Sequence, residues 1–404
     1  MRSRSEPVGA VAAAGAPAAA RFTWPRRAWS PEFRLALLLC VALRAAFSLF
    51  AFALARIVPL RAPCALSVPA PGLHPAGLGF PLLGVWERYD ACFYQRIAAW
   101  GYRPGDEGVA FFPLYPLLMR VAGALTGDLT LAGLLVSGVA TVAALLGLQR
   151  LVARDFGAAV ARRATLSLAL FPTAVFLFVP YAEALFLALA VWAILCARRG
   201  AWGWAAPLAL LAGLTRTQGV LLCLPLAWEF LAQWRRADAA SRPGWRAALV
   251  PALPAAAFGA FFIYGRLASG LTLFQAEHAW GGGATTPWTL LLHSWQYIRA
   301  HADAIEASNL LAFGLFGALL AAGARRLPPT YTLYAAPQLL VIALREGGRS
   351  PLMSTSRFVL VLFPCFVALA LLLGEGRRHR AWLLGSAALL TLALTLYVGG
   401  SFVG

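Results

Sequence analysis

The chain has 404 residues, of which 61% are hydrophobic and only 12% are charged. Soluble domains carry about twice that charged fraction. Apolar runs of roughly 18 residues or more recur along the chain, which is typical of a polytopic helical membrane protein. Because these runs are continuous rather than alternating, they exclude a transmembrane β-barrel. We therefore expect an all-α, polytopic integral membrane protein.

The formal net charge is +18. A basic soluble chain would suggest nucleic-acid binding. Here, however, the arginines fall between the apolar runs, where they set topology and meet anionic lipid headgroups. We therefore expect membrane lipids as partners and no nucleic acid.

The N-terminal segment, residues 1–33, is rich in Ala, Pro and Arg and lacks the sustained apolar core of a cleavable signal peptide. We expect it to be a disordered cytoplasmic arm. Residues 34–400 are expected to form a single transmembrane domain, and its first span covers about 34–57.

About eleven spans are expected in all. The ten that follow the first lie near 129–149, 164–180, 183–197, 202–215, 218–233, 247–266, 304–323, 330–344, 357–373 and 382–400. With the N-terminus inside, most arginines, including the Arg pairs at span ends, fall on the cytoplasmic side, as the positive-inside bias requires. This orientation places two long loops, 58–127 and 267–302, outside.

One polar stretch, from Trp86 to Pro116, interrupts the apolar pattern within the first outer loop. It holds four of the sixteen acidic residues: Glu87, Asp90, Asp106 and Glu107. Apolar residues recur at helical spacing from Asp90 to Trp100, which predicts a short interfacial helix, and a second amphipathic piece follows over about 111–125. Carboxylates among aromatic side chains beside a membrane indicate a site that works at the interface.

Asp90 stands at the start of the predicted interfacial helix. A carboxylate there could act as a general base toward an acceptor hydroxyl. Alternatively, it could simply cap the helix, because Asp is a favoured N-cap residue. The spacing alone leaves both interpretations open.

Glu183, in FVPYAEALF, lies close to the end of an apolar run. Ionised carboxylates within spans are costly and are usually functional or paired. The alternative is a first-turn Glu that the helix dipole stabilises. We favour a functional or paired carboxylate.

Arg216, in LAGLTRTQG, and Arg357, in MSTSRFVL, fall at the outer ends of spans, against the positive-inside trend. A guanidinium in that position could grip a lipid phosphate with two hydrogen bonds. The alternatives are lipid-headgroup contacts or an ion pair with Glu183. Other polar residues at outer span ends, Tyr181 and Gln218, are candidates for substrate binding.

The outer loop 267–302 carries Gln275, His278 and Trp280. Gln275 and Trp280 could hold a sugar by hydrogen bonding and ring stacking, and His278 is either an ordinary loop histidine or a ligand. Cys64 and Cys92 share the first outer loop and could pair if it faces an oxidising compartment. No Cys/His spacing resembles a zinc site, so neither a metal nor another cofactor is expected.

The stretch with Trp86 and Asp90, followed by IAAWGY and AFFPLYPLLMR, resembles the first outer loop of the PIG-V-type mannosyltransferases (GPI mannosyltransferase 2) and their bacterial relatives. FPTAVFLFVPYAEALF, LAGLTRTQGVLL and SRFVLVLFP support the resemblance in the same order. It covers most of residues 86–370. One departure is that relatives often have Trp-Asp where this chain has Tyr89-Asp90, with Trp86 four residues before the aspartate.

The resemblance implies a GT-C membrane glycosyltransferase that takes a sugar, expected to be mannose, from a polyprenyl-phosphate donor. By motif position, the catalytic residue is Asp90, acting as the base of an inverting displacement. Arg216 and Arg357 would bind the donor phosphate. The residues expected to contact substrate are Trp86, Tyr181, Glu183, Gln218, Gln275, His278 and Trp280.

The acceptor implied is a glycolipid or another hydroxyl compound, and the location implied is a bacterial cytoplasmic membrane with the site on its extracytoplasmic face. Two other classes of function remain open from the sequence. A secondary transporter or lipid flippase would place its ionisable residues near the bilayer midplane. A non-catalytic membrane subunit would bind a partner or lipid without transferring a sugar.

Overall fold

The computed structural model describes residues 30–58, 60, 64, 72–279 and 281–403. Nearly all regular structure in these residues is helical, which confirms the all-α prediction. The strands in the described part are β1 (Gly283–Ala284) and β2 (Arg345–Glu346), an antiparallel pair. The expected N-terminal arm up to residue 29, and Trp280, lie outside the described residues.

The helices of the first half of the chain are α1 (Pro31–Ile57), α2 (Gly79–Leu82), η1 (Gly84–Trp86), α3 (Asp90–Trp100), η2 (Glu107–Ala110), α4 (Leu114–Thr126), α5 (Leu129–Phe156), α6 (Ala158–Ala169), η3 (Ala174–Leu177), α7 (Glu183–Arg198) and α8 (Trp202–Gly213). Those of the second half are η4 (Thr217–Leu222), α9 (Cys223–Arg236), α10 (Trp245–Leu249), η5 (Val250–Ala252), α11 (Leu253–Ser269), α12 (Leu273–Ala279), α13 (Pro287–His301), α14 (Ala304–Gly323), α15 (Pro329–Ala343), α16 (Thr355–Phe358), η6 (Val359–Val361), α17 (Phe363–Leu373) and α18 (Arg377–Gly399).

Five helical segments in the described residues are long and apolar enough to cross a membrane: α1, α5, α10 to α11 (Trp245–Ser269), α14 and α18. A sixth candidate, Thr355–Val361 with Phe363–Leu373, is bent by 80°. These spans confirm an integral membrane protein.

The expected count of about eleven spans is not reached when spans are counted by helix length and hydropathy in the described residues. The other five expected spans correspond to α6, α7, α8, α9 and α15, and the longest of these, α7, has 16 residues. At 1.5 Å per residue, such a helix is about 24 Å long, shorter than a hydrocarbon core of about 30 Å. Helix α7 lies instead among α5, α8 and α9 with nearly every side chain buried, which suits a helix that is apolar on all sides.

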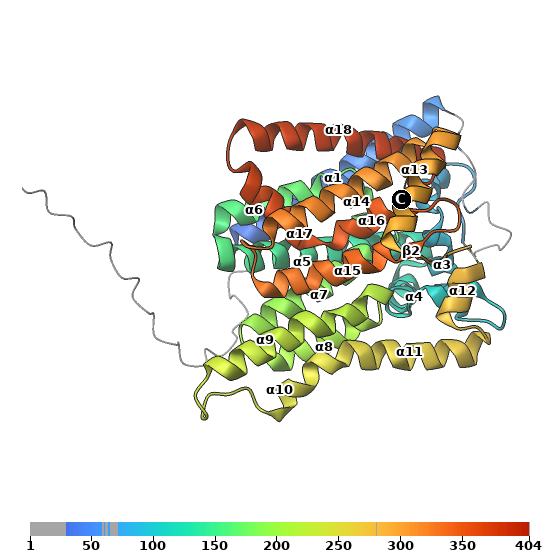
Figure 1. Cartoon of the computed structure of the whole chain (residues 1–404). Helices are drawn as coiled ribbons and strands as arrows, with labels where there is room; N and C mark the ends of the chain where they lie inside the picture. Colours follow the sequence, from blue (N-terminus) through green and yellow to red (C-terminus); the bar gives the residue numbers. More distant parts are fainter. Residues whose placement is uncertain (1–29, 59, 61–63, 65–71, 280, 404) are drawn as a thin grey trace, which may run out of the picture.

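The long helices run side by side, so the molecule has two distinct ends (Figure 1). Helices α3, α4, α12 and α13 gather at one of them, which we call the α3 end. At the opposite end Arg198 approaches Asp155 at 3.2 Å and Glu229 at 3.6 Å, and Arg163 pairs with Glu375 at 2.7 Å. Arginines expected on the cytoplasmic side therefore lie together, away from the α3 end.

Helix α3 has the limits that the sequence predicted, Asp90–Trp100. It begins after Tyr89, whose φ is +52°, a conformation that a residue with a side chain rarely adopts. Strain of this kind costs about 1–3 kcal/mol and persists only where surrounding contacts fix the backbone.

Those contacts come from the C-terminal end of α18 and the residues after it. The Tyr89 hydroxyl donates to the carbonyl of Gly400 at 2.7 Å, and the Tyr89 ring lies edge-on to Phe402 with centroids 4.9 Å apart. Arg88 donates to the carbonyl of Val398 at 2.9 Å. We call this set of contacts the C-terminal clamp, because it fixes the two residues that precede Asp90.

A disulfide joins Cys64 to Cys92, with the two Cα atoms 5.9 Å apart. The pairing considered from the sequence is therefore present, and it ties the start of the first loop to α3. Cys40, Cys196, Cys223 and Cys365 are free thiols.

Replacing both disulfide cysteines by serine should destabilise the fold. The sequence separation is 28 residues, for which loop-closure entropy predicts a loss of about 3–4 kcal/mol. The midpoint of thermal unfolding of the purified protein should fall accordingly, whereas Cys223→Ser, which removes a free thiol, should leave it nearly unchanged. An unchanged midpoint in the double variant would contradict a stabilising crosslink.

Candidate functional site

Four charged side chains form a continuous chain of ion pairs at the α3 end. Arg357 donates from Nη1 to Oδ2 of Asp90 at 2.5 Å, and its Nε lies 3.3 Å from Oε1 of Glu183. Arg216 contacts the same Glu183 oxygen. The structure thus brings together, from four separate segments, the carboxylates and guanidiniums that the sequence singled out.

The two carboxylates occupy equivalent local positions. Asp90 is the first residue of α3 and Glu183 the first of α7. The positive end of a helix dipole favours a carboxylate at this position. Their environments differ, because the Glu183 side chain is 1% exposed whereas that of Asp90 is 22% exposed. Asp90 is therefore the carboxylate that a substrate can reach.

The backbone around Asp90 is fixed by Tyr181. The backbone N–H of Asp90 donates to the Tyr181 hydroxyl at 3.3 Å, and this hydroxyl donates to the carbonyl of Arg88 at 3.2 Å. The N-cap residue of α3 is Tyr89, not Asp90, so the capping alternative for Asp90 is wrong. Tyr181 is fully buried, which suits a positioning residue better than a group that touches substrate.

Arg216 is the N-cap residue of the short helix η4, with an extended backbone. Its Nε donates to Oε1 of Gln218 at 3.2 Å, and its guanidinium lies 5.4 Å from the ring centre of Phe358. Gln218 therefore orients the arginine. The pairing with Glu183 that the sequence left open is present.

The segment that carries Arg357 is held by two buried polar residues of α14. Glu306 accepts from the backbone N–H of Leu352 at 2.9 Å, and Asn309 accepts from that of Ser356 at 2.9 Å. Neither residue was predicted from the sequence. The signal was a Glu and an Asn three residues apart, on one face of an otherwise apolar helix, where buried polar groups need a partner.

Several expected site residues lie outside the ion-pair chain. Trp86 is fully buried, and its indole N–H donates to the carbonyl of Leu82 at 3.0 Å. Gln275 accepts from the Thr272 backbone at 2.8 Å, and His278 contacts the carbonyl of Gly282 at 3.1 Å. The last two contacts are local to their loop, which accounts for these residue types without a ligand.

The other acidic residues of the first loop also have structural partners. Glu87 is fully buried and accepts from Thr130 at 2.6 Å. His74 lies between Glu87, at 2.7 Å, and Asp128, at 2.9 Å. Asp106 pairs with Arg96. Asp90 is thus set apart from its neighbours in this loop by its contact with the arginine cluster.

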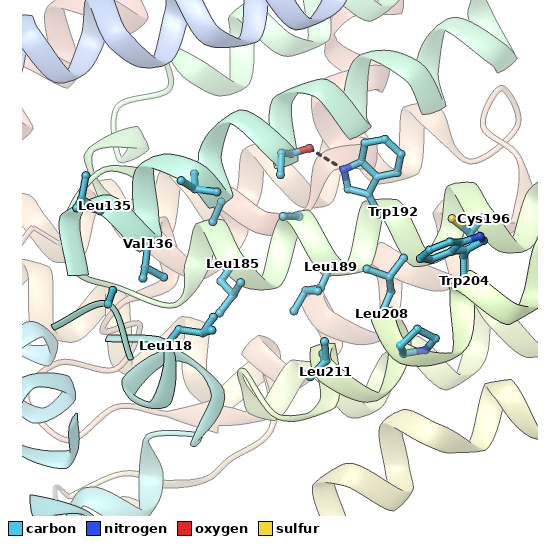
Figure 2. A pocket seen from close by; sticks show the side chains of 16 residues that line it. Leu118, Leu135, Val136, Leu185, Leu189, Trp192, Cys196, Trp204, Leu208 and Leu211 are labelled. Atoms are coloured by element: carbon cyan, nitrogen blue, oxygen red, sulfur yellow. Dashed lines mark hydrogen bonds between the residues drawn. The ribbon is translucent and has the colours of Figure 1, made fainter. Parts of the chain in front are cut away.

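An apolar groove of about 620 Å³ opens between α4, α5, α7 and α8 (Figure 2). Leu118, Leu135 and Val136 lie at one end, and Trp192, Cys196 and Trp204 lie at the other. Leu118 belongs to α4, Leu135 and Val136 lie in the N-terminal part of α5, and Leu185 lies in the first turn of α7, so this end of the groove lies toward the α3 end. A groove of this composition suits a hydrocarbon chain.

The fold and the site together define an all-α integral membrane protein with a cluster of paired carboxylates and arginines at one end of its helices. The family described as mannosyltransferase (PIG-V) matches residues 35–229 of the chain. This match confirms the resemblance found in the sequence and supports a glycosyltransferase. The matched segment includes Asp90, Glu183 and Arg216, whereas Arg357 lies beyond it.

Two solved structures are similar to the chain at low identity. The crystal structure of ArnT from Cupriavidus metallidurans bound to undecaprenyl phosphate is 14% identical, with a TM-score of 0.47, over 90% of this chain and 76% of that one. The crystal structure of the Archaeoglobus fulgidus oligosaccharyltransferase complex with zinc and sulfate is 13% identical, with a TM-score of 0.41, over 92% of this chain and 53% of that one. No curated protein matches the chain. At these identities and TM-scores, neither structure assigns an activity to the protein.

Removing the charge of Glu183 should destabilise the site. Glu183→Gln leaves two buried guanidiniums with less compensation, and breaking a buried ion pair costs about 3–5 kcal/mol. Thermal unfolding in detergent should show a clearly lowered midpoint. Glu346→Gln is the control, because Glu346 pairs with His293 near the surface, where an ion pair contributes about 0–1 kcal/mol. Equal effects of the two substitutions would contradict a central role for Glu183.

Proposed function

We propose that the protein is a membrane glycosyltransferase that moves a sugar, mannose by the family match, from a polyprenyl-phosphate donor to an acceptor hydroxyl. The observation that carries the proposal is a partly exposed carboxylate, Asp90, held against Arg357 in a membrane protein of this family. We further propose that the α3 end faces the extracytoplasmic side of a bacterial cytoplasmic membrane. The disulfide in the first loop supports this, because disulfides persist in oxidising compartments.

The geometry of Asp90 suits a general base. Arg357 holds one carboxylate oxygen, Oδ2. The other, Oδ1, accepts no hydrogen bond from the part of the chain that the structure describes. One oxygen therefore fixes the orientation of the carboxylate, and the other can accept a proton from a hydroxyl within hydrogen-bond reach.

The proposed reaction is a single displacement. The acceptor hydroxyl gives its proton to Asp90 as its oxygen forms a bond to the anomeric carbon. The bond from that carbon to the phosphate oxygen breaks, and its electron pair leaves with the polyprenyl phosphate. One displacement inverts the configuration at the anomeric carbon. Positive charge from Arg216 and Arg357 would stabilise the leaving phosphate.

The apolar groove supports a lipid-linked substrate. One end of the groove lies toward the α3 end, where the ion-pair chain is, so a hydrocarbon chain in the groove could direct its head group to that end. ArnT was crystallised with undecaprenyl phosphate bound, a ligand of the class proposed here. The acceptor is proposed to be a glycolipid or another hydroxyl compound, and no cofactor enters the reaction.

Asp90→Asn should abolish most of the transfer activity. Loss of a general base lowers turnover by about 100- to 10,000-fold. Folding should persist, because Arg357 keeps its contact with Glu183. Turnover is measured with purified protein, a panel of radiolabelled polyprenyl-phosphate sugars and a membrane lipid extract, and mass analysis identifies the product and the acceptor.

Glu107→Gln is the matched control, since it neutralises another carboxylate of the same loop, on helix η2. It should transfer the sugar at close to the normal rate. Near-normal turnover by a well-folded Asp90→Asn protein would reject the role of Asp90. Absence of transfer from every donor by the unaltered protein would reject the glycosyltransferase proposal.

A further inference from the structure

A third arginine, Arg345 of strand β2, lies at the ion-pair chain. Its guanidinium carbon is 5.3 Å from the ring centre of Phe358. Arg216 and Arg357 lie 5.4 Å and 5.1 Å from the same ring centre. One phenyl ring is thus shared by three guanidiniums, each within the range of a favourable cation–π contact. Three like charges around one ring repel one another, so the cluster needs compensating negative charge.

The carboxylates of the cluster compensate only two of the three cations. Asp90 and Glu183 pair with Arg357 and Arg216. Arg345 has no carboxylate oxygen within 4.0 Å among residues 30–58, 60, 64, 72–279 and 281–403. The neighbouring Glu346 is paired with His293 instead. Arg345 is therefore the cation of the cluster that makes no direct ion pair within these residues.

The nearest acidic influence on Arg345 is Glu277 of α12. Burial lowers the pKa of the Arg345 guanidinium, and the negative charge of Glu277 opposes this decrease. Burial raises the pKa of Glu277, and Arg345 opposes that increase. Each charge is thus disfavoured by burial, and the two make no ion pair. A bound anion would relieve the cost of burying the Arg345 cation.

The backbone of Arg345 is held in place by contacts between two loops, and this fixes the point from which its side chain extends. In the register of the strand pair, Arg345 is opposite Ala284 of β1. The backbone N–H of Thr285 donates to the carbonyl of Leu344 at 3.0 Å. These contacts join the loop after α12 to the segment that leads into Arg357.

A small pocket of about 30 Å³ opens beside Arg345 and is lined by Gln218, Thr355 and Phe358 among others. That volume accommodates about one water molecule, so a whole phosphate cannot enter. A single phosphate oxygen can. The remaining oxygens would lie at the mouth, where Arg345 is partly exposed.

We infer that Arg345 completes a phosphate-binding site and supplies a guanidinium that makes no direct ion pair in the described residues, with the phosphate of a polyprenyl phosphate as the ligand. Arg216 and Arg357 share the Phe358 ring with Arg345 but are already paired with the two carboxylates. The inference rests on the proposed function for the identity of the lipid, while the lack of a direct ion-pair partner for Arg345 within the described residues stands on the contacts alone. An arginine suits the task because its planar donors match phosphate oxygens.

The test is direct binding of undecaprenyl phosphate to the full-length protein in nanodiscs. Arg345→Gln should weaken binding by about 10- to 100-fold, the effect of losing one charge-assisted hydrogen-bonded contact. Arg345→Lys, which keeps the charge, should retain part of the affinity. The matched control is Arg349→Gln, which removes an exposed arginine of the same loop and should bind as the unaltered protein does.

Three further ligands separate the possible sources of the affinity. Undecaprenol, which lacks the phosphate, should bind all variants equally. Neither phosphatidylglycerol nor inorganic phosphate should displace undecaprenyl phosphate at comparable concentration. Displacement by either would overturn the assignment of a polyprenyl phosphate. Unchanged binding by a well-folded Arg345→Gln protein, or a Lys variant as weak as the Gln variant, would overturn the role of the charge.

This measurement also distinguishes failure of the inference from failure of the proposed function. Binding is measured without a sugar donor or an acceptor, so it does not depend on transfer. If Arg345→Gln weakens binding while no variant transfers any sugar, the phosphate site stands and the enzyme proposal falls. If transfer occurs, the same substitution should raise the KM for the donor more than it lowers kcat.

Discussion

The candidate site depends on one buried carboxylate. Glu183 is 1% exposed and contacts two arginines, Arg216 and Arg357. Without it, two buried guanidiniums would share one partly exposed aspartate, which contacts Arg357 alone, and this is a costly arrangement. With it, segments far apart in the sequence meet at fixed positions. Glu183 therefore holds the cations in place, while Asp90, at the end of the ion-pair chain, stays partly exposed.

The charged residues of the site could be predicted because charge is rare in this chain and costly in a membrane. Asp90, Glu183, Arg216 and Arg357 stood out against apolar neighbours, and the structure brings them together. Helix α3 was predictable to the residue, since its apolar spacing is local information. The all-α membrane fold followed from hydropathy. The number of spans could not be predicted in the same way, because hydropathy does not show whether an apolar segment is one straight helix or a broken one.

The partners of these residues could not be predicted. The contact of Arg357 with Asp90 joins positions 267 residues apart, and nothing local in the sequence encodes such a pairing. In the sequence, Arg345 could not be distinguished from other loop arginines. In the structure it shares the ring of Phe358 with Arg216 and Arg357. Gln275 and His278 had the residue types of a sugar site, but their side chains bond within their own loop. Residue type alone does not distinguish these cases, because the direction of a side chain is set by tertiary packing.

The C-terminal clamp has a consequence for biosynthesis. Arg88 and Tyr89 are held by carbonyls that are translated 310 and 311 residues later. At about 5–20 residues per second, a ribosome needs about 15–60 s to cover that distance. Throughout this interval the strained backbone before Asp90 lacks the contacts of the C-terminal clamp, although Tyr181 is already available. The clamp can therefore form only after the C-terminal end of α18 has been made, so a chain stalled before that point would lack these contacts at Arg88 and Tyr89.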